Sequence, residues 1–153
     1  MEQTNDTIKA YGNLVIELRD ATGNLKDRRE VKNLVVTAGR TYIASRMVGT
    51  ASNVMSHMAV GTGTAAAAAA NTGLGTEAAR VTLTSSTPTG ATVAYAATFD
   101  ENTPASATAI TEAGIFNASS GGTMLCRTTF NPINKSVGDT LTVNWNVTIN
   151  ASA

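Results

Sequence analysis

Strict alternation of apolar and polar side chains near the end of the chain limits the fold most. In residues 140–150, TLTVNWNVTIN, the apolar side chains fall on every second position, at Leu141, Val143, Trp145, Val147 and Ile149. Successive side chains of a β-strand point to opposite faces, so this pattern predicts a half-buried strand with one apolar face. Burial of each such side chain contributes about 1.5–3 kcal/mol. We therefore predict that this strand organises the hydrophobic core.

The same period of two recurs in segments that are separated by turn signals. Residues 80–85, 92–99 and 109–130 predict further strands, the last of them a hairpin around the polar turn 117–122. About eight short strands of this kind predict a mainly-β fold, a β-sandwich or jelly roll with one short helix. We expect residues 1–10 to form a flexible N-terminal arm and residues 11–153 to form a single β-sandwich domain. The predicted core residues are Ile43, Phe99, Phe116, Leu141, Val143, Trp145 and Val147.

One segment, TAGRTYIASRMVG, predicts a helix over about residues 37–48. Thr37 is expected to cap its N-terminus and Gly49 to end it. Val36, Ile43 and Met47 are spaced to share one helical face. A helix this short is not stable alone, so we expect its apolar face to lie on a sheet or on a neighbouring subunit.

Residues 13–36 predict a long hairpin with many charges. Leu14, Ile16 and Leu18 alternate with more polar positions, and Gly23 suits the turn at residues 20–24. One interpretation is a solvated strand face, because charge pairs across a ladder contribute only about 0.2–1 kcal/mol each. The other is a surface that contacts a partner, and its candidate residues are Arg19, Lys26, Arg28 and Arg29.

A glycine-rich turn, GTGT, and six consecutive alanines occupy residues 61–70. Six alanines do not overcome the cost of helix nucleation. The stretch therefore predicts a surface loop or a single helical turn. The alternative is a segment that packs flat on another subunit, with Ala65 and Ala68 as candidate contacts.

The charge balance argues against several kinds of partner. Eleven basic and eleven acidic residues cancel, and charged residues make up only 14% of the chain. No basic field for nucleic acid is expected, and a neutral, charge-poor surface tends to associate. No apolar run is long enough for a membrane-spanning helix, and the polar start of the chain does not resemble a signal peptide.

The sequence contains few residues that could catalyse a reaction or bind a metal or cofactor. His57 is the only histidine and Cys126 the only cysteine, so an internal disulfide and a paired-cysteine metal site are excluded. The GTGT turn lacks the lysine and the spacing of phosphate-binding loops. We expect His57 to be a surface or packing residue and Cys126 an inert core residue. No catalytic, cofactor-binding or metal-binding residue is predicted, and no cofactor.

Three acidic residues leave alternatives open. Glu112 lies in the otherwise apolar segment ITEAGIF, on the face that we assign to Ile110 and Phe116. It is expected to pair with Arg127 across the hairpin, the alternative being a catalytic acid of glycoside hydrolysis. Asp100 and Glu101 could bind a cation, but the spacing of a calcium loop is missing.

Three stretches together resemble a family of small virion proteins of tailed bacteriophages. They are NLVVTAGRTYIASRM, MAVGTGTAAAAAANTGLGTEAAR and AITEAGIFNASSGGTMLCRTTFNPINKSVGDTLTVNW, within residues 33–149. The resemblance implies a structural protein of the virion and carries over no catalytic residue. Cys126 stands where this family commonly has alanine.

From the resemblance and the short, charge-poor chain we expect a non-enzymatic capsid decoration (cement) protein. Its partners would be the major capsid protein lattice and copies of itself, on the outer surface of a phage head made in the host cytoplasm. The alternative is a tail or head-fibre module, including a receptor-binding tip that contacts the host. A carbohydrate-processing enzyme has almost no residue-level support beyond Glu112.

Overall fold

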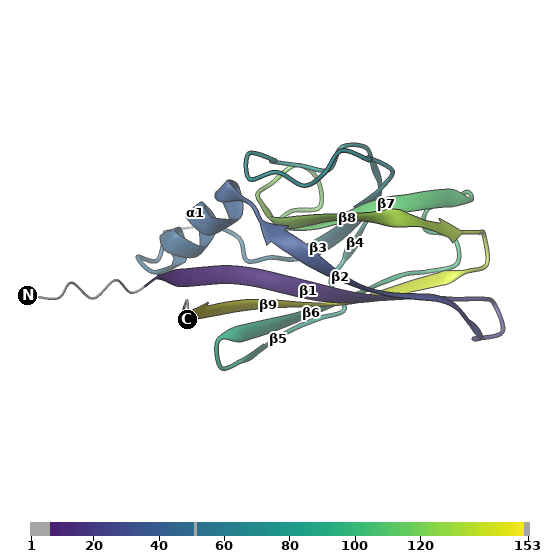
Figure 1. Ribbon diagram of the computed structural model, residues 1–153, viewed down its shortest axis with the longest axis horizontal. Coiled ribbons are helices and arrows are strands. Elements are labelled where there is room, and N and C mark those ends of the chain that lie inside the picture. Colours follow the sequence, from purple (N-terminus) through teal and green to yellow (C-terminus); the bar gives the residue numbers. More distant parts are fainter. Residues whose placement is uncertain (1–6, 51, 152–153) are drawn as a thin grey trace, which may run out of the picture.

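A computed structural model describes residues 7–50 and 52–151 of the chain. It is mainly β, as predicted, with one short helix and nine strands in place of about eight (Figure 1). The elements are β1 (Ile8–Arg19), β2 (Leu25–Val35), α1 (Thr37–Arg46), β3 (His57–Gly61), β4 (Glu77–Thr82), β5 (Ser85–Thr89), β6 (Thr92–Phe99), β7 (Thr108–Phe116), β8 (Met124–Lys135) and β9 (Thr140–Ala151).

All nine strands belong to one antiparallel sheet in the order β4-β3-β7-β8-β2-β1-β9-β6-β5. β2 pairs with β1 over most of its length, whereas only Leu34 and Val35 pair with β8. The sheet curls at this narrow junction. As a result, the half containing β3, β7 and β8 lies across the half containing β1, β9 and β6 (Figure 1).

The main core lies between these two halves. Leu141, Val143, Trp145 and Val147 are buried in it along one face of β9, and Phe99 joins them from β6. Ile149 is 37% exposed, so the prediction of a fully buried stripe is wrong at its last position. The reason is that β6 pairs with β9 only as far as Thr148, so Ile149 lies at the rim.

β7 is buried on both faces, because its half of the sheet carries a second layer of residues outside the main core. Phe116 packs there in a smaller cluster with Val36, Ala59 and Met124. Ile110, by contrast, belongs to the main core. The prediction that Ile110 shares the face of Glu112 and Phe116 is therefore wrong, because a register shift between Ile110 and Glu112 interrupts the alternation.

The helix is shorter and differently capped than predicted. It ends at Arg46, the capping position is Val36, and Thr37 makes no capping hydrogen bond. Ile43 is half-buried against the main core, but Met47 is 85% exposed, because it follows the last helical residue and does not reach the sheet. Gly49 has a φ of 67° and closes the turn after the helix, as predicted.

Gly39 allows α1 to approach β8 closely. A Cβ atom added at Gly39 would lie 2.8 Å from the carbonyl carbon of Leu125. We expect Gly39→Ala to lower the free energy of unfolding by about 1–3 kcal/mol, although alanine favours a helix, because backbone atoms must shift. Thermal unfolding measures the change. Gly73→Ala is the matched control, since nothing lies within 4 Å of a Cβ there, and equal stability of the two variants would contradict the close packing.

The predicted charged hairpin is confirmed as β1 and β2, with Leu14, Ile16 and Leu18 buried. The expected N-terminal arm is partly wrong. Residues 1–6 lie outside the described residues, but β1 begins at Ile8, which pairs with Ala151 of β9. Residues 8–10 therefore belong to the sheet.

Candidate functional site: a clamped alanine loop

The alanine stretch lies in a long loop, residues 62–76, that joins β3 to β4 without helix or strand. The surface-loop prediction is confirmed: Ala65, Ala66, Ala68, Ala69 and Ala70 are exposed. Loops of this length without secondary structure are uncommon in compact domains and are usually functional or disordered. We therefore call residues 62–76 the alanine loop and ask what holds it in place.

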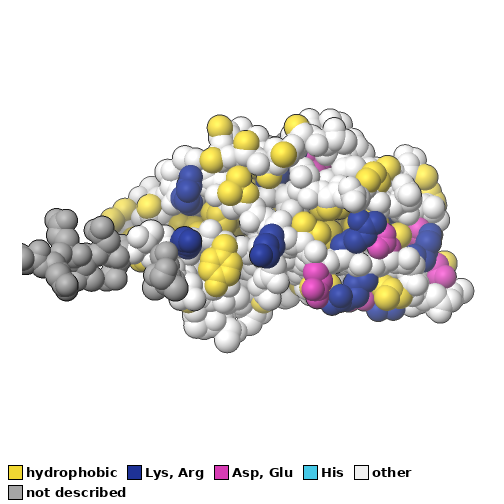
Figure 2. Space-filling view, in the orientation of Figure 1, with side chains coloured by type: hydrophobic (Ala, Val, Ile, Leu, Met, Phe, Trp, Pro, Cys, Tyr) yellow, Lys and Arg dark blue, Asp and Glu magenta, His cyan; other side chains and the backbone are white. Residues whose placement is uncertain are grey.

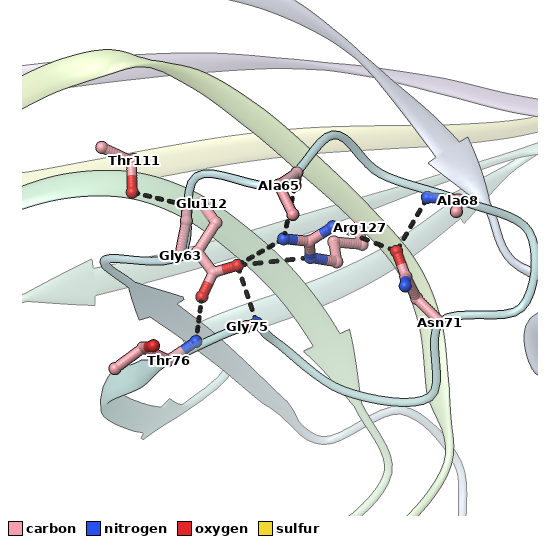
Figure 3. A network of polar contacts seen from close by, with 9 residues as sticks. All are labelled: Gly63, Ala65, Ala68, Asn71, Gly75, Thr76, Thr111, Glu112 and Arg127. Atoms are coloured by element: carbon pink, nitrogen blue, oxygen red, sulfur yellow. Dashed lines mark hydrogen bonds and ion pairs between the residues drawn. The ribbon is translucent and has the colours of Figure 1, made fainter.

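A buried ion pair lies directly beneath the alanine loop (Figure 3). Nη2 of Arg127, on β8, is 2.7 Å from Oε2 of Glu112, on β7. The side chains are 2% and 0% exposed, respectively. The predicted pairing across the hairpin is confirmed.

Arg127 also binds the loop itself. Its guanidinium donates hydrogen bonds to the carbonyl oxygen of Ala65 and to Oδ1 of Asn71, both at 3.0 Å. Oδ1 of Asn71 accepts a further bond from the backbone N–H of Ala68, at 2.7 Å. One buried cation thus fixes the two ends of the alanine run.

Glu112 binds the returning end of the loop. Its carboxylate accepts hydrogen bonds from the backbone N–H groups of Gly75, at 2.9 Å, and Thr76, at 2.8 Å. Burial raises the pKa of Glu112, but the hydrogen bonds from Thr76, Arg127 and Gly75 outweigh it and leave the pKa below its ordinary value. Both oxygens are engaged, so the carboxylate is held ionised as an anchor.

The glycines of the GTGT turn make room for this carboxylate. A Cβ atom at Gly63 would lie 2.7 Å from Oε2 of Glu112, and one at Gly61 would lie 2.5 Å from Oε1. The turn therefore does cradle an anion, but the anion is the chain's own carboxylate. The sequence signal for this cradle is the pair Gly61 and Gly63, but the sequence does not show that the carboxylate of Glu112 lies against them.

Protonation of Glu112 at low pH should lower the free energy of unfolding of the domain. Because the folded-state pKa is lowered from 4.5, the stabilisation is complete above the unfolded-state pKa and is lost as the pH falls through the folded-state value. We expect wild-type protein to lose more unfolding free energy between about pH 6 and pH 3 than Glu112→Gln, which has no proton to gain at this site. Chemical denaturation across this range measures both slopes, and parallel slopes would contradict an ionised anchor.

The basic residues that we predicted as partner contacts do not join the alanine loop. They lie on the β1–β2 hairpin, and each is neutralised by a nearby carboxylate. The pairs are Arg19 with Glu17 at 2.8 Å, Lys26 with Asp139 at 2.7 Å, Arg28 with Glu30 at 3.0 Å, and Arg29 with Asp27 at 2.9 Å. Ala65 and Ala68, in contrast, belong to the clamped loop.

The other side chains considered for chemistry are either hydrogen-bonded to neighbouring residues or buried in the core. Nδ1 of His57 lies 2.8 Å from Oγ of Ser56. Cys126 is buried in the main core, which raises the pKa of its thiol. Oδ1 of Asp100 accepts a hydrogen bond from the N–H of Asn102, and no group of three or more metal-ligating side chains occurs among residues 7–50 and 52–151.

Sequence reasoning missed a buried lysine and a groove. Lys135 is 2% exposed, and its Nζ donates to the carbonyl oxygen of Asp100 at 2.7 Å. Burial lowers the pKa of Lys135, although Asp139 and Asp100 oppose the shift.

The groove, of about 600 Å³, separates α1 from the alanine loop and is lined by Thr37, Ala38, Thr41, Tyr42, Ser45, Ser52, Ala69, Ala70, Asn71, Thr72 and Thr123.

In the part of the chain that the structure describes, no helix has the length and apolar character needed to span a membrane. Comparison of the chain with models of protein families, with curated proteins and with solved structures finds no match.

Proposed function

We propose that this chain is a non-enzymatic structural protein of a bacteriophage virion, a capsid decoration protein that binds the major capsid protein lattice. The observation that carries the proposal is the alanine loop. It is exposed and offers methyl groups and backbone, yet a buried ion pair holds both of its ends. Such a loop is pre-organised for contact and loses little conformational entropy when a partner covers it.

The chemistry of the described residues supports contact rather than turnover. The carboxylate nearest the loop, Glu112, has both oxygens engaged by the loop and Arg127. Contacts made by alanine side chains are individually weak, and many copies on a repeating shell would add them through multivalency. In this proposal the two facing halves of the curled sheet are the layers of a β-sandwich, and neighbouring copies contact one another on the shell.

The second candidate is a tail or head-fibre module. The groove between α1 and the alanine loop favours it, because its hydroxyl and methyl lining could receive a segment of a host receptor. The two candidates differ in the number of copies on each particle.

We expect purified virions to contain hundreds of copies of the protein, since a decoration protein follows the capsid lattice. Quantitative gel analysis against the major capsid protein measures the ratio, and antibody labelling in electron micrographs locates the copies. A few to a few dozen copies confined to the tail would favour the fibre module. Absence of the protein from virions would overturn both candidates.

A further inference from the structure

Four basic side chains lie at the end of the molecule that carries α1, without a carboxylate partner among the described residues. They are Lys9 on β1, Lys32 on β2, and Arg40 and Arg46 on α1, and all four are exposed. Arg40 donates only to the hydroxyl of Thr37, and Arg46 donates to the carbonyl oxygen of Ser52. These acceptors are neutral, and among residues 7–50 and 52–151 no ion pair joins any of the four cations to a carboxylate.

The other basic side chains of the described residues either form ion pairs or are buried. Six of them form ion pairs: Arg19, Lys26, Arg28, Arg29, Arg80 and Arg127. The remaining one, Lys135, is buried. Figure 2 shows the result on one face: basic and acidic side chains lie side by side toward the β1–β2 turn, whereas the basic side chains toward α1 lie apart from the acidic side chains drawn in magenta.

Large apolar side chains protrude from the same end. Met47 and Val48 follow α1 directly and are 85% and 81% exposed, and Val54 in the next loop is 62% exposed. Methionine and arginine are enriched in protein interfaces. We call Met47 and Val48 the apolar centre. Exposed apolar side chains and exposed cations toward the same end of a molecule favour a contact surface over a solvated loop.

We propose that this basic α1 end, formed by Lys9, Lys32, Arg40, Arg46, Met47 and Val48, docks on an acidic protein surface, and that this surface belongs to the capsid shell. The inference rests on the proposed function and adds the chemistry of the partner's side: carboxylates around a shallow apolar depression. It also moves the basic contact from the turn end of the β1–β2 hairpin, where Arg19, Lys26, Arg28 and Arg29 are already paired, to the end that carries α1.

Two other acidic partners fit less well. Nucleic acid would call for a broader basic field, but the chain has a net charge of zero. An anionic membrane would call for a helix with a wide apolar face, whereas α1 has the sequence TAGRTYIASR and is only ten residues long. The first six residues of the chain carry Glu2 and Asp6 and are a third candidate occupant.

The test uses heads that carry the capsid lattice but lack this protein, mixed with the purified full chain. Binding is measured by co-sedimentation at low and at raised salt. The test variant is Lys32→Glu with Arg40→Glu, and the control is Arg19→Glu with Arg28→Glu, which changes the net charge equally at the other end. Met47→Gln tests the apolar centre, and melting curves establish that each variant is folded.

We expect Lys32→Glu with Arg40→Glu to bind heads at least about 10-fold more weakly than wild type, and raised salt to weaken wild-type binding. Met47→Gln should also weaken binding, and the control should match wild type. Equal binding of the two charge-reversal variants would overturn the inference and leave decoration standing. Failure of the wild type to bind heads would overturn the proposed function and the docking surface with it.

Three further results would assign the basic α1 end to another partner and overturn the inference. One is charge-sensitive binding of wild type to duplex DNA or to phosphatidylglycerol vesicles that exceeds binding to heads. Another is that removal of residues 1–6, which carry Glu2 and Asp6, destabilises the domain but leaves head binding unchanged. The third is a change of oligomeric state, measured by sedimentation, in Lys32→Glu with Arg40→Glu.

Discussion

Replacing Arg127 with alanine is expected to lower the free energy of unfolding by about 3–5 kcal/mol, because the change leaves the buried carboxylate of Glu112 without its cation. The alanine loop should be the first segment to lose its fixed conformation. The carbonyl oxygen of Ala65 and Oδ1 of Asn71 would both lose a donor. Chemical denaturation measures the stability, and hydrogen exchange of the amides of residues 62–76 measures how far the loop is released.

Arg28→Ala is the matched control for this change. Arg28 also pairs with a glutamate, at 3.0 Å, but both side chains of that pair are exposed. Exposed pairs contribute about 0–1 kcal/mol, so the control should cost no more than that and should leave the loop amides unchanged. If Arg127→Ala costs as little as Arg28→Ala, the ion pair is not the clamp.

Replacing Trp145 with alanine should lower the free energy of unfolding by about 3–5 kcal/mol, because it leaves a cavity in the main core. Trp145 is completely buried, and its Nε1 donates a hydrogen bond of 3.0 Å to Oδ1 of Asn33 on β2. The variant therefore removes both packing and a polar link between β9 and β2. Thermal and chemical unfolding of the variant give the loss.

Ile149→Ala provides the comparison on the same strand and the same face. Ile149 is 37% exposed at the rim of the core, so its truncation should cost only about 1 kcal/mol. If both substitutions lower the free energy of unfolding equally, Trp145 and Ile149 do not differ in burial as described. A folded Trp145→Ala variant with unchanged melting would place Trp145 outside the core.

Much of the secondary structure could be predicted from local patterns. Alternation in residues 140–150 predicted β9, and the turns at Gly23 and at residues 117–122 predicted two hairpins. The pairing of Glu112 with Arg127 was also predictable, because a hairpin places its two strands side by side. These features depend on neighbours in sequence or on one tight turn, and such information is present in the chain itself.

Errors arose where a single residue changed the register or where an element ended. The register shift after Ile110 moves that side chain into the main core, although alternation assigns it to the face of Glu112. Met47 continues the helical spacing but lies beyond the last helical residue. A periodic pattern contains no sign of the point at which the period is broken.

The sequence determined a mainly-β chain with few reactive groups, whereas only the tertiary structure decided what its charged and small residues do. Glu112 reaches Thr76 across 36 residues, and Arg127 reaches Ala65 across 62. The same holds for the cations: Arg19, Lys26, Arg28 and Arg29 toward the β1–β2 turn are neutralised in place, whereas Lys9, Lys32, Arg40 and Arg46 come from three elements toward the other end. Hydrogen bonds and charge pairs depend on distances of a few ångströms, and the curl of the sheet sets those distances between segments far apart in sequence.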